Sequence, residues 1–171
     1  MELVKSAKDI FYSECDIVVR RSEVDDAEKL AFKLSEHDKL EAWLIGHNTP
    51  LEALKYAYDS SIISMTIEHS GSVVGMLGII PDEVLGQKAC IWFLASDELK
   101  DIGRVFLRNA KKIIGGLLEY YPFLYGNIHV ENKTSMFWMQ YCGCRIEKAR
   151  PYGVEGSMFH PFSFERIHAS T

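Results

Sequence analysis

The sequence lacks any apolar run long enough to cross a membrane. Its longest uninterrupted runs, residues 73–81 and 90–95, are far shorter than the roughly 20 residues that a membrane-spanning helix needs. Residues 1–20 also lack the apolar stretch and small-residue site of a secretory signal, because charged side chains occur throughout them. We therefore expect no membrane association and a cytoplasmic location.

Metal-binding and nucleic-acid-binding patterns are missing as well. The four cysteines include the close pair Cys142 and Cys144, but no second pair of Cys or His lies at a spacing that would complete a zinc site. The net charge is -5, whereas phosphate backbones are bound by clustered Lys and Arg. We expect free cysteines, no metal and no nucleic-acid partner.

Length and composition fit one domain. The chain has 171 residues, of which 47% are hydrophobic, and this is enough for a single core. We place the domain at residues 16–164, between an N-terminal extension (1–15) and a C-terminal tail (165–171).

The beginning of the domain predicts a strand and two helices. Residues 16–21 are rich in β-branched side chains, and Ser22 and Asp25 have the spacing of a capping box for the helix that follows them. Residues 49–52 (Thr-Pro-Leu-Glu) combine a capping hydroxyl, a proline at the first helical position and a glutamate three residues after the cap. This second signal predicts another helix.

The middle of the chain predicts three antiparallel strands. Residues 62–68 alternate between apolar and polar, and Ser70-Gly71 supplies a turn into residues 73–80. Residues 73–80 and 90–95 are apolar on both faces, which is typical of central strands covered by helices on two sides.

The remaining elements complete a mixed sheet. Residues 101–121 have the clearest helical period of the chain, residues 124–130 alternate as a strand, and Asn132 should cap a helix. Residues 145–150 and 158–164 are predicted closing strands. The expected fold is therefore a single α/β domain (α+β mixed sheet) with the order β-α-α-β-β-β-α-β-α-β-β.

One motif is typical of a known family. Asn132-Lys-Thr-Ser135 is followed by Gly143, eleven residues after the asparagine. Together with the order of elements, this resembles the GNAT superfamily of N-acetyltransferases over about residues 16–164. The resemblance implies an acyl-CoA N-acyltransferase fold, acetyl-CoA as the acyl donor, and an amine as the acceptor.

A narrower resemblance rests on other segments. Residues 41–43, the helix 50–58, residues 104–108 and the tail 151–156 with Phe159-His160 look like a branch of GNAT-like proteins encoded by tailed bacteriophages. Some members of that branch are similar to small internal virion proteins. This implies a virion or host protein as a possible partner, and the host cytoplasm or the virion as the location.

The superfamily holds its coenzyme at the end of the fourth strand and the start of the next helix, where backbone amides cradle the pyrophosphate. Residues 97–104 contain only one glycine of the usual glycine-rich loop, so basic side chains would replace amide contacts to phosphate. The residues that the resemblance assigns to the coenzyme are Leu94, Ala95, Ser96, Lys100, Gly103, Arg104 and Asn132.

The usual general acid is absent. The superfamily places a tyrosine seven residues after the asparagine, and here that residue is Met139, which cannot donate a proton. Tyr141 lies about 200° further round the helix and should point away. Ser135, one turn before Met139 on the same face, is the candidate substitute.

The candidate general bases are His129 and Glu131, on the polar face of the strand 124–130. A histidine titrates near neutral pH and can take a proton from an ammonium group. Both residues also have a structural interpretation, because a strand histidine can simply be hydrogen-bonded and a carboxylate before a helix complements its dipole.

Four aromatic residues leave two interpretations open: Trp92, Phe93, Phe137 and Trp138 can form core or line an acyl or pantetheine channel. The leading functional hypothesis is acetyl transfer from acetyl-CoA to an amine, with amides near residues 94–96 holding the thioester carbonyl. The alternatives are a catalytically impaired phage protein of the same fold, and a sensor that binds acyl-CoA without turnover.

Overall fold

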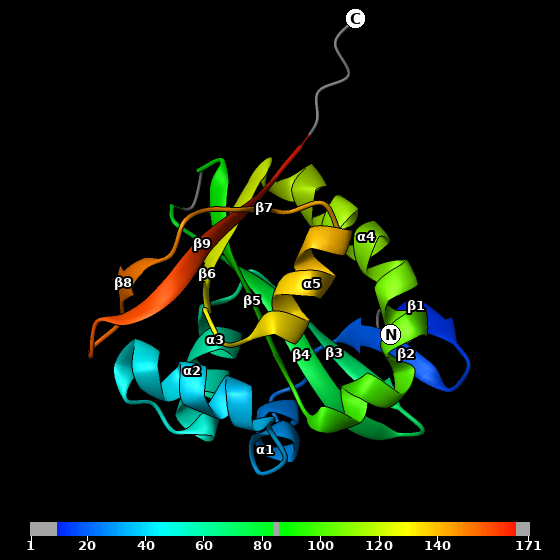
Figure 1. Cartoon of the computed structure of the whole chain (residues 1–171). Coiled ribbons are helices and arrows are strands. Elements are labelled where there is room, and N and C mark those ends of the chain that lie inside the picture. Colours follow the sequence, from blue (N-terminus) through cyan, green and yellow to red (C-terminus); the bar gives the residue numbers. More distant parts are fainter. Residues whose placement is uncertain (1–9, 84–85, 167–171) are drawn as a thin grey trace, which may run out of the picture.

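One mixed β-sheet with helices on both faces forms the centre of the structure (Figure 1). The computed structural model describes residues 10–83 and 86–166. The strands are β1 (Ile10–Glu14), β2 (Ile17–Arg21), β3 (Ile63–His69), β4 (Ser72–Pro81), β5 (Lys88–Ala95), β6 (Phe123–His129), β7 (Arg145–Ile146), β8 (Arg150–Tyr152) and β9 (Ser157–Glu165). The helices are α1 (Asp26–Ala31), α2 (Glu36–Gly46), α3 (Pro50–Ser60), the 3-10 helix η1 (Asp97–Ile102), α4 (Gly103–Tyr120) and α5 (Lys133–Tyr141).

The strand order is β1-β2-β3-β4-β5-β6-β9-β7, and β8 pairs with the free part of β9. Every neighbouring pair is antiparallel except β5 and β6, which are parallel because α4 connects them across the sheet. The predicted mixed single-domain fold is therefore confirmed. No helix of the described residues is long and apolar enough to span a bilayer.

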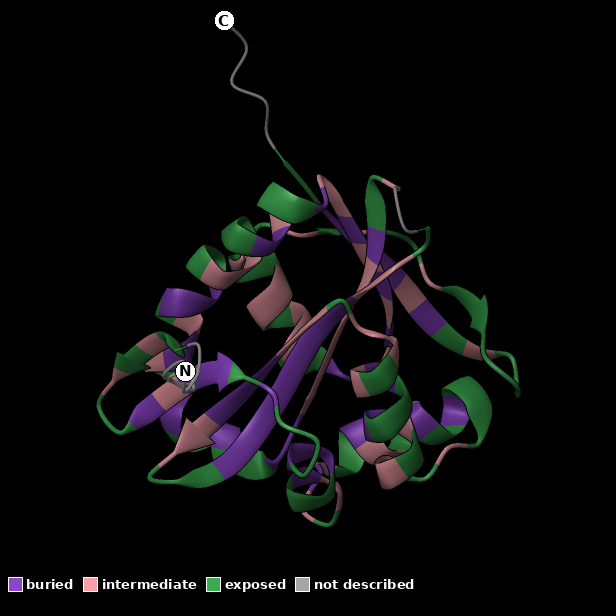
Figure 2. Ribbon diagram, turned by 180° about the vertical axis from the view of Figure 1, so that it is seen from behind, coloured by how far each residue is buried: buried purple, intermediate pink, exposed green. Residues whose placement is uncertain are grey.

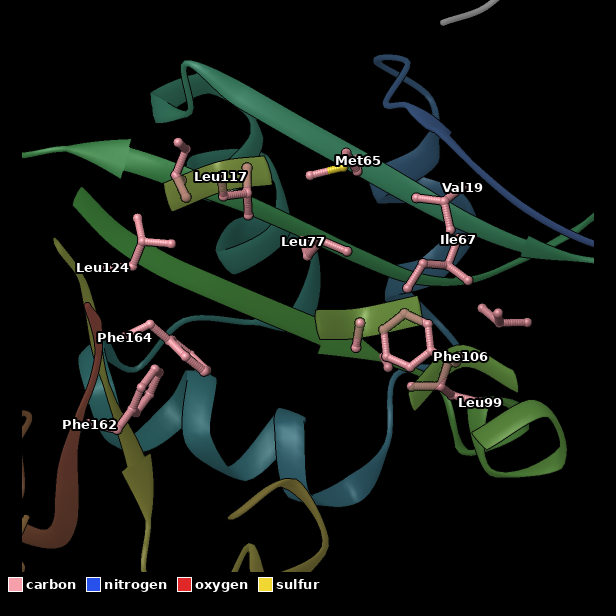
Figure 3. Close-up of a cluster of buried hydrophobic side chains, with 14 of the residues drawn as sticks. Val19, Met65, Ile67, Leu77, Leu99, Phe106, Leu117, Leu124, Phe162 and Phe164 are labelled. Carbon is pink, nitrogen blue, oxygen red and sulfur yellow. The ribbon is translucent and has the colours of Figure 1, made fainter. Parts of the chain in front are cut away.

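Two hydrophobic clusters lie on opposite faces of the sheet. Met76 of β4 packs with Leu30 of α1 and Leu54 of α3, whereas Leu77 packs with Phe106 of α4. Successive side chains of a strand point to opposite faces, so β4 supplies both clusters. Figure 3 shows the larger cluster, with Phe106 between the sheet and α4.

Helix α5 packs less tightly than the others. No residue of α5 is buried (Figure 2), although Met136, Trp138 and Met139 pack against the larger cluster. Trp138 and Met139 also line a cavity between α5 and the sheet.

Several local predictions need correction. Ser22 does not cap α1, because the residue at the N-cap position is Asp25, whose side chain makes no cap hydrogen bond. The buried Ser22 hydroxyl lies 2.9 Å from Thr66 Oγ1 instead. The predicted closing strand 145–150 is two short strands, β7 and β8. The capping box of Thr49 and Glu52, in contrast, is confirmed.

The ends of the chain differ from the expected boundaries in one respect. The segment 1–15, expected as an extension, contributes β1 (Ile10–Glu14) to the edge of the sheet. Residues 1–9 of that extension and 167–171 of the expected tail lie outside the described residues.

Candidate functional site

The parallel strands β5 and β6 separate part-way along their length. They pair only through Lys88–Cys90 on β5 and Phe123–Tyr125 on β6, although both strands continue. A cavity of about 560 Å³ is lined by the diverging segments, residues 90–94 and 125–128. This volume is in the range of small-molecule sites.

The cavity extends across the plane of the sheet. Trp92 and Leu94 pack with the cluster on the α1–α3 face, whereas Ile91 and Phe93 pack with the cluster on the α4 face, and all four residues line the cavity. Two substrates could therefore approach each other from opposite faces through the gap between the strands.

The cavity has two parts, one on the face of the sheet covered by α2, the α2 lobe, and one on the face covered by α4, the α4 lobe. The α2 lobe includes Asp38, Glu41, Ala42, Ile45, Ala53, Tyr56, Ala57, Trp92, Leu94, Asn127 and Tyr152. The α4 lobe includes Leu77, Phe93, Phe106, Ala110, Ile113, Ile114, Ile128, Ser135, Trp138, Met139, Cys142, Phe162 and Phe164.

Asp38 is a buried carboxylate at the start of α2. Ser35 caps this helix, its side chain accepting a hydrogen bond from the Asp38 N–H at 3.2 Å. Asp38 Oδ2 accepts the N–H of Ala95 at 2.8 Å. Burial raises the pKa of Asp38 to about 7 against the effect of that hydrogen bond, and the neighbouring Glu41 adds to the rise.

Glu41 lies one turn after Asp38 on the same face of α2. Its Oε1 accepts the backbone N–H of His129 at 3.1 Å and the side-chain N–H of Asn132 at 2.9 Å. Burial raises the pKa of Glu41, and these two hydrogen bonds oppose the rise. Glu41 therefore connects α2 to the junction of β6 and α5, at the open end of the gap.

Neither carboxylate was predicted as a site residue, because no helix was predicted over Glu36–Gly46. The Ser-x-x-Asp spacing that predicts a cap at Ser22 occurs again at Ser35, and only the second copy caps a helix. Few side chains of α2 are buried, only Asp38, Ala42 and Leu44, so no strong apolar stripe marks the helix in the sequence.

The predicted bases lie elsewhere. Glu131 is exposed, and neither it nor His129 is among the residues that line the cavity. The His129 ring packs edge-on against Phe159 with centroids 5.1 Å apart, and its Nδ1 accepts the N–H of Glu131 at 3.4 Å. The structure supports the hydrogen-bonded interpretation of His129.

The positions of Asn132 and of the candidate acid on α5 agree in part with the predictions. Asn132 is buried and caps α5, its Oδ1 accepting the N–H of Ser135 at 3.3 Å. Ser135 and Met139 both line the α4 lobe. Tyr141 points away, because its exposed ring lies under Lys111 Nζ at 4.5 Å from the centroid.

The predicted amide contacts to a thioester are already occupied. The N–H of Ala95 donates to Asp38, and the N–H of Ser96 donates to the carbonyl of Val74 at 2.9 Å. Both bonds would have to break before these amides could hold a carbonyl oxygen. Leu94 lines the α2 lobe by its side chain.

The predicted pyrophosphate residues lie around the N-terminus of α4. Lys100 is exposed and pairs with Asp97 at 2.6 Å, and Arg104 is exposed in the first turn. Trp138 of α5 packs against Gly103, where an added Cβ would come within 3.2 Å of the indole ring. Helix α5 thus covers part of the helix start to which the resemblance assigns the phosphates.

The aromatic residues take both of the open roles. Phe93 stacks on Phe106 with centroids 5.7 Å apart, Trp138 lies 6.0 Å from Phe106, and all three border the cavity and the core. Trp92 lines the α2 lobe and donates its N–H to Ser61 Oγ at 2.7 Å. Phe137 is 63% exposed and does neither.

The charge of the cavity has one sign. Its lining includes the carboxylates Asp38, Glu41 and Asp82, and no Lys, Arg or His among the described residues. The four cysteines are free, and the described residues contain no group of three His, Cys, Asp or Glu that could hold a metal ion. Burial raises the pKa of the cavity cysteines Cys90 and Cys142, so neither is an activated thiolate.

The fold is that of the GNAT acetyltransferases. No protein-family model matches the chain, and no curated protein matches it. A GNAT-family acetyltransferase from Bacillus anthracis superposes with a TM-score of 0.67 at 14% identity, over 91% of this chain and 98% of that chain.

Two further solved structures indicate the range of the fold. A ribosomal-protein-S5-alanine acetyltransferase from Vibrio fischeri has a TM-score of 0.66 at 12% identity, over 95% of this chain and 99% of that chain. Spermidine N-acetyltransferase from Vibrio cholerae, solved with CoA and spermine, has a TM-score of 0.62 at 15% identity, over 89% of this chain and 96% of that chain.

Proposed function

We propose that this chain, which has the fold of the GNAT acetyltransferases, is an acyl-CoA-dependent N-acyltransferase. The observation that carries the proposal is the cavity through the gap between β5 and β6, with the buried Asp38 and the half-buried Glu41 on one face and an apolar lobe on the other. An acceptor amine would enter by the α2 lobe, and the thioester of acetyl-CoA would reach the gap from the α4 lobe.

The reaction needs a neutral amine next to the thioester carbonyl. The amine nitrogen attacks that carbon, a C–N bond forms, and the C–S bond breaks with release of the coenzyme thiolate. We assign proton removal from the ammonium to Glu41 and Asp38, because they are the carboxylates at the gap and burial raises the pKa of both. This moves the base from His129 and Glu131 to α2.

Protonation of the departing thiolate has fewer candidates. Ser135 lies in the α4 lobe on the same face of α5 as Met139, so its hydroxyl is the group that we assign to this step. A serine hydroxyl is a weak acid, so the rate should depend on positioning of the two substrates more than on proton donation.

The chain fits acetyl-CoA in one part and fits it poorly in another. The α4 lobe offers an apolar slot for the pantetheine arm, and Lys100 and Arg104 offer charge for the phosphates at its outer end. The occupied amides of Ala95 and Ser96 and the Trp138 ring over Gly103 weaken the usual amide cradle.

Those same features favour a second function. A chain that binds the coenzyme weakly would serve as a virion or host-interaction component encoded by a tailed bacteriophage, in keeping with the narrower resemblance of its sequence. A sensor that keeps acyl-CoA affinity without turnover is the intermediate case. For the enzyme and the sensor we expect the cytoplasm as the site of action, that of the host cell if a phage encodes the chain, and for the virion component the virion.

Coenzyme binding is the first test of the proposal. Calorimetric titration with acetyl-CoA should give micromolar binding that weakens at least tenfold in Arg104→Ala. The matched control is Lys112→Ala, an exposed cation further along the same helix, and it should bind like the wild type. No binding at millimolar acetyl-CoA would favour the virion or host-interaction component.

Turnover is the second test. Release of free CoA thiol in the presence of an amine panel should fall by about 10²–10⁴-fold in Glu41→Gln, the usual contribution of a general base. Glu131→Gln should change the rate little, because Glu131 is exposed and outside the cavity. Equal losses of rate in both variants would mean that the general base lies at the end of β6, as the sequence predicted.

A further inference from the structure

The α2 lobe contains two carboxyl groups, and no Lys, Arg or His of the described residues lines the cavity beside them. Asp38 accepts the Ala95 N–H and a hydrogen bond from the Ser35 side chain, and Glu41 accepts two neutral N–H groups. Neither carboxylate takes part in an ion pair of the described residues. The exposed His37 acts on Asp38 through its charge, but it does not line the cavity. A buried carboxylate is costly without a cation or a full set of donors. A cationic ligand in the lobe would supply the missing partner.

A second polar group in the same lobe lacks a partner. Asn127 Oδ1 is the only buried side-chain nitrogen or oxygen of the described residues without a hydrogen bond. Leu124 and Ile128 of β6 join the cluster on the α4 face, so Asn127, at odd spacing from them, faces α2. An alkylammonium group has three N–H donors, and the lobe offers two carboxylates and this carbonyl as acceptors.

The rest of the lobe is apolar, and its rim is aromatic. Ala42, Ala53 and Trp92 line the wall. Tyr56 and Tyr152 border the mouth with 69% and 40% of their surfaces exposed. Large rings left half in water around a cavity mouth are surfaces that an apolar ligand would cover, and aromatic faces also attract cations.

The lobe does not provide a second anionic site for a long polycation. The remaining carboxylate of the cavity, Asp82, already accepts a hydrogen bond from the Tyr125 hydroxyl, at the end where β5 and β6 are paired. A polyamine would leave its other ammonium groups against apolar wall or in solvent.

We infer that the acceptor is a monocationic amine with an apolar or aromatic body, whose ammonium group binds at Asp38, Glu41 and Asn127 and whose body lies against Trp92 and the tyrosine rim. That this amine is an acyl acceptor rests on the proposed function. The binding itself needs no acyl donor, so it is tested without one.

Calorimetric titration in the absence of any CoA compound tests this ligand class. Three probes separate its features: phenethylamine carries charge and an aromatic body, 2-phenylethanol is its neutral counterpart, and spermidine carries charge without an apolar body. Phenethylamine should bind at least tenfold more tightly than either of the others. Equal affinity for the alcohol, or tighter binding of spermidine, would overturn the inference.

Variants locate the site. Asp38→Asn, Glu41→Gln and Asn127→Leu should each weaken phenethylamine binding by about tenfold or more, the scale of one lost charge-assisted hydrogen bond. Glu131→Gln is the control that should change nothing, since Glu131 is exposed outside the cavity. Unchanged affinity in all three cavity variants would place the amine elsewhere.

One exposed position allows a gain of function that needs no change in the core. Tyr56 is mostly exposed on α3, so Tyr56→Glu should fold normally and add a second anion at the rim. This variant should improve spermidine binding relative to phenethylamine by at least fivefold, and an unchanged ratio would contradict the proposed position of the ligand body.

The two proposals fail in different ways. Phenethylamine binding without any acetyl transfer would support the ligand class and contradict the acyltransferase proposal. Transfer from acetyl-CoA to spermidine and phenethylamine at equal rates would support the acyltransferase and contradict the ligand class.

Discussion

Two carboxylates on neighbouring helices are both buried, yet their surroundings are opposite. Asp26 of α1 is fully buried, and its two oxygens accept the Arg20 guanidinium at 2.7 and 3.0 Å. Asp38 of α2 is 9% exposed, accepts the Ala95 N–H and a hydrogen bond from the Ser35 side chain, and forms no ion pair with any of the described residues, although the exposed His37 acts on it through its charge. The fold itself supplies a cation partner for Asp26, whereas Asp38 would obtain such a partner only from a bound ligand.

The pKa values of the two groups follow from these surroundings. Burial raises the pKa of Asp26, but hydrogen bonds from Arg20, the Glu23 N–H and Thr66 outweigh it and lower the value to about 2. Burial raises the pKa of Asp38 to about 7. We therefore assign a structural role to a buried acid that has a cation partner within the protein. We infer a ligand site where a buried acid borders a cavity and has no such partner.

Removing the internal cation should have the largest effect. Arg20→Met leaves Asp26 buried without its partner, so the free energy of unfolding should fall by about 3–5 kcal/mol. Urea denaturation at pH 7 measures the change. A loss below 1 kcal/mol would mean that water reaches Asp26 and would remove the contrast with Asp38.

Removing the charge of Asp38 should have the opposite sign. The folded-state pKa of about 7 lies above the unfolded value of 3.8, so ionised Asp38 destabilises the fold as the pH rises from about 4 to 7. Asp38→Asn keeps an acceptor for the Ala95 N–H and should raise the free energy of unfolding by roughly 2–4 kcal/mol at pH 8.

The pH dependence of that difference is its control. The difference between the wild type and Asp38→Asn should shrink as the pH falls below 7 and level off below 3.8, where the carboxyl is protonated in both states. Asp26 behaves in the reverse way, because its depressed pKa contributes stability that is lost as the pH falls from 3.8 towards 2. A destabilised Asp38→Asn at pH 8 would show that the charge of Asp38 is satisfied within the chain.

The hydroxyl next to Asp26 should matter less than the guanidinium. Thr66 is buried, with its Oγ1 2.8 Å from Asp26 Oδ2 and 2.9 Å from Ser22 Oγ. Thr66→Val keeps the shape and removes these bonds, so we expect a loss of about 1–2 kcal/mol in the same denaturation experiment. No loss would show that Asp26 is satisfied without the hydroxyl of Thr66.

The exposed partner of Asp26 should contribute least. Lys29 is half-exposed, and its Nζ lies 3.4 Å from Asp26 Oδ1. Lys29→Ala should change the free energy of unfolding by less than about 0.5 kcal/mol, because solvent screens such a pair. A loss as large as that of Thr66→Val would move Lys29 into the structural network.

The sequence predicted the scaffold better than the site. Strong local signals fixed the capping box at Thr49, the helix cap at Asn132 and the hairpin of β3 and β4, and the structure confirms all three. These features depend on short-range spacing, which one sequence records directly.

The site depended on contacts that no local pattern records. Asp38 meets Ala95, and Glu41 meets the His129 and Asn132 N–H groups, across separations of 57, 88 and 91 residues. His129 and Glu131 sit on a polar strand face in the sequence, but the fold turns that end against Phe159 and solvent. Helix α2 was the missing element, because few of its side chains are buried.

The central claim is that Asp38 has no direct ion pair among the described residues of the free protein and receives one from a bound amine. An NMR titration of the Asp38 carboxyl carbon, with Asp38→Asn to assign the signal, tests it directly. We expect a pKa near 7 in the free protein and a clear decrease when phenethylamine saturates the cavity. A value near 4 without ligand, or a pKa that phenethylamine does not change, would contradict the claim.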